Sequence, residues 1–302
     1  MLLWLGVFAA SLVGLLKASD WFVDASERIG LSLGVSPFVI GVTIVAFGTS
    51  LPELASSIVA VSSGESEIVF GNVVGSNIAN ICLVLGLVAV VAGTIRMDFS
   101  VLDVDVPVLV SSALLLWVFA RDGVVGWVEG ALLCGMLVVF LVNSFRTHGA
   151  QEGVQVAAGW RAYALLVGGA VGVYLGARFT VESIQVLSEQ LGIASGVIAA
   201  SAVALGTSLP EVIVSVAAAR KGKPGMAVGN VVGSNIFNSF GVMGVPAFVG
   251  PIAVPPEQLA FSLYYMIGVT VLFAFMAAAN NVSRWEGVML LGMYAIFLFE
   301  LF

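Results

Sequence analysis

The feature that most restricts the fold of this chain is a series of ten apolar segments separated by short polar connections. A helix that crosses a bilayer needs about 20 predominantly apolar residues, and each segment approaches or exceeds that length. Only 10% of the residues are charged, and the mean hydropathy is +1.11, whereas soluble domains carry about 25% charged residues. The sequence therefore predicts an all-α polytopic membrane protein. Its ten transmembrane helices are expected near residues 2–30, 36–61, 67–92, 101–120, 124–145, 159–189, 195–219, 225–249, 258–279 and 284–302.

The positive charges predict how these helices are oriented. The even-numbered connections between helices carry only Arg121, whereas most other basic residues fall in the odd-numbered connections. Because Lys and Arg accumulate in cytoplasmic loops, we expect the odd connections in the cytoplasm and both termini outside the cell (plasma) membrane. The basic residues of the odd connections are Arg28, Arg96, Arg146, Arg161, Arg220, Lys221, Lys223 and Arg284.

Charge and residue usage argue against several other classes of protein. The net charge of −7 lacks the basic footprint of a nucleic-acid-binding protein. The single histidine, His148, and the two cysteines in apolar segments, Cys82 and Cys134, do not favour a transition-metal site or a disulfide framework. We expect a monomer surrounded by lipid bilayer, with no cofactor and no nucleic-acid partner.

The chain contains an internal repeat with a constant offset. GTSLPE occurs at residues 48–53 and again at 206–211, and GNVVGSNIxN occurs at 71–80 and 229–238, so both motifs repeat after 158 residues. Each half holds five predicted spans, an odd number, so the second half must enter the membrane from the opposite side. The sequence therefore predicts two inverted five-helix repeats, a common plan in secondary transporters. The predicted boundaries are a first repeat at 1–146, a cytoplasmic linker at 147–158 and a second repeat at 159–302.

The repeat places two acidic residues, Glu53 and Glu211, within apolar spans. An acidic side chain at the bilayer centre costs about 3 kcal/mol on insertion scales. An axis relating the two repeats would bring both carboxylates together near the midplane, where they repel or share a proton unless a cation lies between them. Calcium suits such a site because it binds several oxygen ligands, carboxylates included. Thr49 and Thr207 precede the glutamates by four residues and so share their helix face.

Prolines directly before the glutamates suggest a second source of oxygen ligands. Pro52 and Pro210 lack a backbone donor and crowd the preceding helical turn. We therefore expect each helix to break just before its glutamate and to free carbonyl groups near residues 46–48 and 204–206. Non-helical backbone at that depth is tolerated where it lines a cavity.

The second motif adds neutral oxygen atoms. Ser76 and Asn80 share one helix face, as do Ser234 and Asn238. Uncharged hydroxyl and amide oxygens suit a monovalent ion such as sodium, so we predict that these four residues line the site.

Other polar residues in the spans receive a structural interpretation. Asn77 and Asn235, next to the serines, are expected to hold helices together. Charged residues within the first and sixth spans are expected to pair with one another or to extend to the membrane interface. These are Lys17, Asp20, Asp24, Arg178 and Glu182.

The paired motifs GTSLPE and GNVVGSNIxN resemble the alpha repeats of the cation/calcium antiporter superfamily, and the prokaryotic sodium/calcium exchangers in particular. The resemblance implies a core of spans 2, 3, 7 and 8, across which spans 1 and 6 slide during alternating access. It implies that Glu53, Glu211, Thr49 and Thr207 bind calcium. Sodium would be bound by these groups together with Ala46, Ser50, Ser76, Ala204, Ser208 and Ser234, while Asn80 and Asn238 occupy the remaining polar positions.

The resemblance also bears on the choice of ion. Some relatives, including the potassium-dependent branch, carry aspartate where Asn238 stands, which argues against potassium dependence here. We predict a secondary active antiporter, not an enzyme, that exchanges sodium for calcium by alternating access at a midplane site. Calcium and sodium are then transported ions, not cofactors. A proton/calcium antiporter and a passive cation channel remain open as alternatives, whereas glutamates among cation ligands disfavour an intramembrane aspartyl-type protease.

Overall fold

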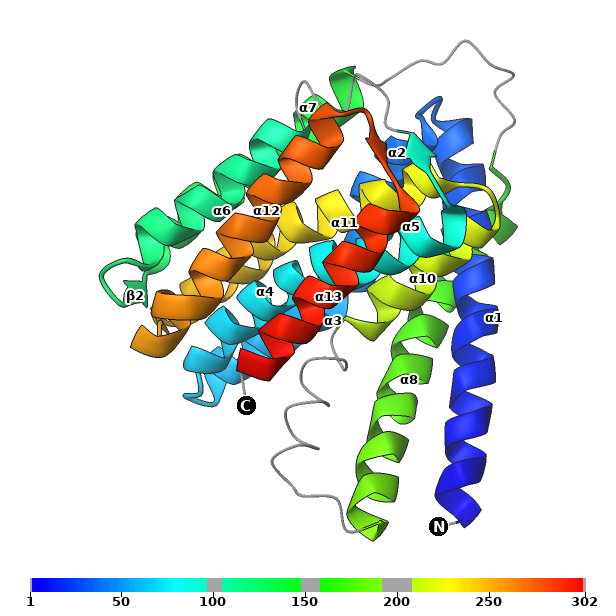
Figure 1. Ribbon diagram of the computed structural model, residues 1–302, viewed down its shortest axis with the longest axis horizontal. Helices are drawn as coiled ribbons and strands as arrows, with labels where there is room; N and C mark the ends of the chain where they lie inside the picture. The colour runs from blue at the N-terminus through cyan, green and yellow to red at the C-terminus, as the bar shows by residue number, and fades with distance from the viewer. Residues whose placement is uncertain (1, 97–104, 148–157, 192–207, 301–302) are drawn as a thin grey trace.

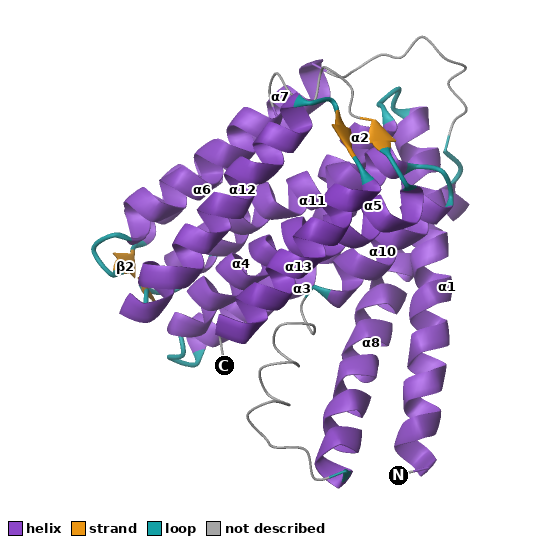
Figure 2. Cartoon of the chain, viewed as in Figure 1, coloured by secondary structure: helices purple, strands orange, loops and turns teal. Residues whose placement is uncertain are grey.

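The computed structural model describes residues 2–96, 105–147, 158–191 and 208–300, and almost all of them are helical (Figures 1 and 2). In the first half, the helices are α1 (Leu2–Ser32), α2 (Pro37–Ile40), η1 (Gly41–Val45), α3 (Ala46–Ser62), α4 (Glu67–Ala79), η2 (Asn80–Leu85), α5 (Gly86–Ala92), α6 (Val106–Ala120) and α7 (Trp127–Thr147). In the second half, they are α8 (Trp160–Gln190), α10 (Leu209–Arg220), α11 (Pro224–Phe237), η4 (Asn238–Val242), η5 (Pro246–Phe248), η6 (Gln258–Ser262), α12 (Leu263–Ala278) and α13 (Arg284–Glu300). The four strands are β1 (Ile95–Arg96), β2 (Val124–Val125), β3 (Ile252–Ala253) and β4 (Asn281–Val282).

The ten predicted transmembrane helices are confirmed. Several elements join end to end, and seven of the described helical stretches are long and apolar enough to cross a membrane. The shorter helices α6, α10 and α13 complete the set of ten. Most bounds agree with the predicted ones to within a few residues, because the length of an apolar stretch is read directly from the sequence. The start of the seventh span lies outside the described residues.

Two short strand pairs show the relation between the halves. In the pair β1–β4, Ile95 lies opposite Val282, and in the pair β2–β3, Val124 lies opposite Ala253. By the 158-residue offset, Ile95 is equivalent to Ala253 and Val124 is equivalent to Val282. One strand pair is therefore equivalent to the other. Each pair contains one strand from each half. The halves are therefore related by a pseudo-two-fold operation, as the inverted repeat requires.

The tight turns that follow α3 and α10 obey the same symmetry. Gly64 and Gly222 adopt positive φ angles of 84° and 73°, a region that glycine enters without steric cost. The next residue closes each turn on the preceding helix: Glu65 N–H donates to the Ala60 carbonyl at 2.9 Å, and Lys223 N–H donates to the Ala218 carbonyl at 3.0 Å. The two turns thus share one backbone conformation.

Three of the four central spans can be compared with the outer ones, and they are more buried. The share of buried residues is 89% in the span at Pro224–Phe248, 78% at Glu67–Ala92 and 61% at Pro37–Ser62. By contrast, it is 17% at Leu2–Ser32 and 22% at Trp127–Ser144. The motif-bearing helices therefore form the core, and the outer helices present their apolar side chains to lipid.

The core helices of the two halves cross at glycines. A Cβ atom on Gly229 of α11 would lie 2.3 Å from the Phe38 carbonyl oxygen and 3.1 Å from the Cα atom of Gly41. Real Cβ atoms do not approach backbone so closely, so only glycine permits this crossing. It sets the spacing between α11 and the α2–η1 stretch, and so the distance between side chains of the two motifs.

Helices α1 and α8 lie side by side as a long pair that extends from the bundle (Figure 1). They are antiparallel, because Phe22 packs against Gly169 whereas the earlier residue Leu15 packs against the later residue Gly176. Both chain termini lie towards the lower part of the view, away from the β1–β4 pair. The first and sixth spans thus form a separate layer against the core.

Candidate cation site

The two glutamates of the repeated motif lie in the centre of the core. Glu53 is on α3 and Glu211 is in the first turn of α10, and the exposed fraction of each is 1%. Predicted site residues that are also buried are Ala46, Thr49, Ser50, Ser76, Asn80, Ser208, Ser234 and Asn238. Ala204 and Thr207 lie outside the described residues.

Hydrogen bonds bring the motif of one half to the motif of the other. The Ser50 hydroxyl donates to Glu211 Oε1 at 3.3 Å, and Thr49 also interacts with the Glu211 side chain. Thr49 Oγ1 lies 3.3 Å from two acceptors, the Ala46 carbonyl oxygen and Asn230 Oδ1. One site is therefore assembled from residues about 160 positions apart.

Many oxygen atoms of this site have no hydrogen-bond partner within the described part of the chain. They include both carboxylate oxygens of Glu53, Oε2 of Glu211, the Ser208 hydroxyl and the side-chain amides of Asn80 and Asn238. Leaving a buried polar group without a partner costs about 1–3 kcal/mol, and more for a charged group. So many unsatisfied oxygens in one place are characteristic of a site that a cation completes.

The charge of the site supports the same conclusion. Glu53 and Glu211 repel each other, and the ion pairs between described residues involve neither of them. Among the residues that the structure describes, no group of three or more His, Cys, Asp or Glu side chains is arranged so that it could hold a metal ion. A cation here would be held by two carboxylates and by neutral oxygens, a donor set suited to hard ions and not to transition metals.

The expected helix break before Glu53 is wrong. Pro52 lies inside the continuous helix α3, and the irregular backbone lies earlier, in the π-helical turn η1. Proline removes one hydrogen bond, and within a packed bundle neighbouring groups compensate, so helix can continue through it. In the second half, α10 begins at Leu209, next to Pro210, while the segment before Ser208 lies outside the described residues.

Two π-helical turns occupy equivalent positions in the second motif. η2 begins at Asn80, and η4 begins at Asn238. Such turns are rare and often occur at functional sites. Because each adds a residue to the helical turn, it changes the direction of the asparagine side chain relative to a regular helix. This feature repeats in both halves.

Asn77 and Asn235 connect helices, as predicted. The Asn235 amide donates to the Asn77 carbonyl at 3.1 Å, and the Asn77 amide donates to the Ser239 hydroxyl at 2.9 Å. For Asp20 and Asp24, the first of the two predicted alternatives, pairing with other charges of the first and sixth spans, is wrong. Both pair instead with Lys221, at 3.3 and 2.8 Å, because the turn between α10 and α11 approaches α1.

Sequence reasoning missed Asn230, which is fully buried beside the site. Its Oδ1 atom accepts from the hydroxyls of Thr49 and Ser234 at 3.3 and 3.4 Å, and its amide donates to the Ser215 hydroxyl at 2.8 Å. In the first half, Asn72 donates to Ser57 at 3.3 Å, which is the equivalent pair. The repetition of the asparagine in both copies of GNVVGSN was the available signal.

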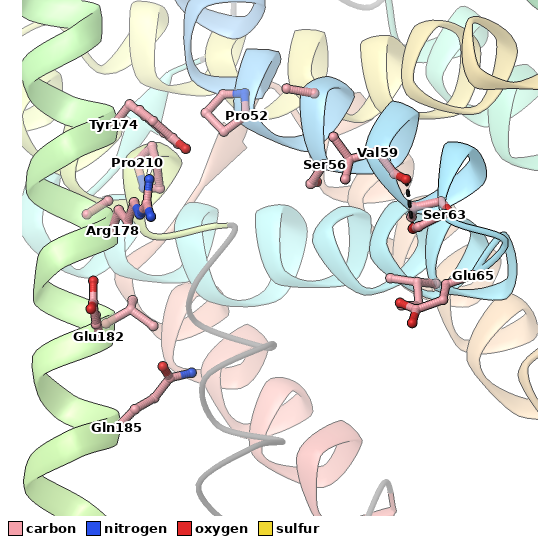
Figure 3. Close-up of a pocket in the computed structure, with 15 residues that line it drawn as sticks. Pro52, Ser56, Val59, Ser63, Glu65, Tyr174, Arg178, Glu182, Gln185 and Pro210 are labelled. Atoms are coloured by element: carbon pink, nitrogen blue, oxygen red, sulfur yellow. Dashed lines mark hydrogen bonds between the residues drawn. The ribbon is translucent and has the colours of Figure 1, made fainter. Parts of the chain in front are cut away.

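A cavity of about 850 Å³ reaches the prolines that adjoin the two glutamates (Figure 3). It lies between α3 and α8 and extends from Pro52 and Pro210 towards the α3–α4 turn at Ser63 and Glu65. From α8 it is lined by Tyr174, Ala177, Arg178, Val181, Glu182 and Gln185. The cavity therefore connects one end of the molecule with the neighbourhood of the site.

Inverted five-helix repeats around a buried pair of carboxylates define a class of secondary transporters. The profile of the sodium/calcium exchanger protein family matches residues 3–146 and 161–302. The chain therefore belongs to the sodium/calcium exchanger family and is a multi-pass membrane protein. Cation/calcium exchange is the activity of this family, which consists of transporters and not enzymes.

Individual relatives support this assignment over the whole chain. The sodium/calcium exchanger MaX1 of Methanosarcina acetivorans is 35% identical, with 98% of this chain and 97% of the relative covered. The inner membrane protein YrbG of Escherichia coli is 31% identical, covering 100% and 98%. Solved structures of the sodium–calcium exchanger NCX_Mj, soaked with sodium and strontium ions, match at 34% identity with a TM-score of 0.87, covering 98% and 97%.

Proposed function

We propose that this chain is an antiporter that exchanges sodium for calcium by alternating access at the site around Glu53 and Glu211. The observation that carries the proposal is the set of buried oxygens without partners, contributed by both halves of the chain. Names of relatives and of a solved structure, which include sodium and calcium, support the same pair of ions.

The proposed ligands are the residues that the repeats bring to the centre. Calcium is bound by the two glutamates with Thr49 and Thr207. Sodium ions use overlapping ligands, so both ions compete for one set of carboxylates. The remaining ligands are Ala46, Ser50, Ser76, Ala204, Ser208 and Ser234, with Asn80 and Asn238 lining the site.

Coupling follows from the charge of the empty site. Two carboxylates without a cation resist enclosure, because a bare charge in a low-dielectric interior is costly. Calcium or sodium ions neutralise the pair and allow the site to close and reopen on the other side. Exchange is then favoured over passage of one ion alone.

The proposed orientation follows the positive charges. The turn between α10 and α11 and the linker at 147–158 lie in the cytoplasm, and both termini lie outside the plasma membrane. The cavity beside α3 and α8 then opens to the outside. A single chain contributes both halves of the site, which supports a monomer as the working unit.

The test is calcium uptake by purified protein in liposomes under an imposed sodium gradient, without potassium. We expect uptake that follows the sodium gradient and that is lost in Glu53→Gln and Glu211→Gln. Glu257→Gln is the matched control, because Glu257 is exposed and outside the core. Uptake that follows a pH gradient and ignores sodium would establish the proton/calcium alternative, and calcium flux without a counter-ion would establish a channel.

A further inference from the structure

A cluster of charges joins α1 to the turn between α10 and α11. Lys221 Nζ lies 3.3 Å from Asp20 Oδ1 and 2.8 Å from Asp24 Oδ1. Lys223 Nζ lies 3.6 Å from Asp24 Oδ1 and 2.6 Å from Glu27 Oε2. Lys221 also donates to the backbone carbonyl of Asp20 at 2.9 Å. We call these five residues the lysine clamp.

The 158-residue offset maps the lysine clamp onto the opposite end of the molecule. There the two turn residues become Ser63 and Glu65, so the lysines are absent although the turn has the same backbone. The three acidic residues of α1 become Arg178, Glu182 and Gln185 on α8. Between described residues, no ion pair joins α8 to the α3–α4 turn.

The two ends also differ in how they are closed. All five positions equivalent to the lysine clamp line the cavity, to which both α3 and α8 contribute side chains (Figure 3). Ser56 of α3 is exposed in this cavity, whereas its equivalent on α10, Val214, has an exposed fraction of 0%. Among the described residues, the side chain at this position is buried at the end that carries the clamp and faces a cavity at the end that lacks it.

We propose that the lysine clamp keeps the site closed to the cytoplasm and thereby favours the state in which the site is open to the outside. The inference rests on the proposed alternating access and orientation. Because the two turns share one backbone, the difference in charge sets the preference between the two states. In the opposite state, α1 moves away from the α10–α11 turn and α8 covers the cavity.

The exposure of the lysine clamp suits a contact that must open in every cycle. The exposed fractions are 24% for the Lys221 side chain and 47% and 50% for those of Asp20 and Asp24. Ion pairs in contact with water are weak individually and are screened by salt. Separating them returns the charges to water and not to a dry interior. The lysine clamp therefore shifts the equilibrium between the two states without preventing their interconversion.

The test measures how accessible each end of the molecule is, by labelling single cysteines in protein reconstituted in liposomes. One reporter, Ser56→Cys, lies in the cavity, and the other, Val214→Cys, lies at the buried equivalent. Both are placed in a background in which Cys82 and Cys134 are alanine. Maleimide labelling of Val214→Cys relative to Ser56→Cys is expected to rise at least about fivefold when Lys221 and Lys223 are replaced by alanine, the shift produced by about 1 kcal/mol.

Two further variants make the test specific. Arg220→Ala removes a neighbouring positive charge that lies outside the clamp and should leave the labelling ratio unchanged. Lys223→Glu should raise the ratio, and adding Glu27→Lys should lower it again, because the pair is restored with reversed charges. An unchanged ratio in the Lys221→Ala, Lys223→Ala protein, with an intact peak on size-exclusion chromatography, would overturn the proposal.

The clamp can also be transferred to the other end. Ser63→Lys, Glu65→Lys, Arg178→Asp and Gln185→Glu reproduce it there, since Glu182 already stands at the position of Asp24. We expect labelling of Ser56→Cys to fall at least about fivefold, which is about the same free-energy shift in the opposite direction. Unchanged labelling would contradict the proposed role of the lysine clamp. Labelling needs no ion exchange, so a normal labelling response in a protein that fails to exchange sodium for calcium would contradict the proposed function alone.

Discussion

At the scale of single residues, the site depends on where the hydroxyl hydrogens point. A hydroxyl has one hydrogen and two lone pairs, so a group that accepts its hydrogen leaves the lone pairs of the oxygen free to face a cation. Asn230 provides that acceptor to Thr49 in one half and to Ser234 in the other, and Ser215 holds Asn230 in place. We therefore expect Asn230 to act as a positioning residue for ligands from both halves.

Replacing Asn230 tests this role. Asn230→Leu keeps the size of the side chain but removes the acceptor, so the KM for sodium and for calcium should rise about tenfold, since an unmade buried hydrogen bond costs about 1–3 kcal/mol. Asn230→Asp retains an acceptor and should recover part of the affinity. The measurement is initial calcium uptake as a function of each ion. Ser215→Ala, which loosens Asn230 without removing its oxygen, should have a smaller effect, and equal effects of the three variants would contradict the role.

At the scale of elements, the site is positioned by the crossing of α11 with the α2–η1 stretch. Gly229 and Gly41 allow the two backbones to approach, and the motif side chains of both halves follow in the next turns. The irregular η1, η2 and η4 turns lie next to these motifs. The helix crossing and the irregular turns thus have separate roles. The crossing fixes the distance between the helices, and the irregular turns set the direction of the side chains.

A methyl group at the crossing should show this dependence on close packing. Gly229→Ala places a carbon 2.3 Å from the Phe38 carbonyl oxygen, and overpacking of this kind costs about 1–3 kcal/mol. We expect a lower thermal unfolding midpoint in detergent and reduced exchange. Gly225→Ala on the same helix is the matched control, because no atom lies within 4 Å of the added carbon. Equal midpoints for the two variants would show that the crossing tolerates extra volume.

At the scale of the whole molecule, the sequence predicted the spans and the inverted repeat, because hydrophobic length and a constant offset are properties of the sequence itself. The same offset singled out Glu53 and Glu211, which are both buried in the core, while their role as cation ligands stays a prediction. The sequence did not predict that Asp20 and Asp24 pair with Lys221, because periodicity along a helix does not say which distant turn approaches it. It also predicted a break at Pro52 that is absent, since the cost of a proline depends on neighbours that only the folded bundle supplies.

A further prediction concerns the stability of the whole bundle. A ligand that binds only the folded protein raises its stability by an amount that grows with ligand concentration, about 2.7 kcal/mol at one hundred times Kd. Calcium should therefore raise the thermal unfolding midpoint of the purified chain, and sodium should do so at higher concentration. The increase should be absent in Glu53→Gln and kept in Glu257→Gln. A calcium effect that survives Glu53→Gln would place the stabilising ion elsewhere.

The two strand pairs have a consequence for the origin of the chain. In the described part of the chain, each strand pairs with a strand of the other half, and the two pairs are equivalent in register. One half alone would leave both of its strands without partners, whereas two copies of that half, inserted in opposite directions, would supply each other's missing strands at the same positions. The fold is thus a pair of antiparallel subunits joined into one polypeptide, the arrangement expected when the gene for such a subunit is duplicated and fused.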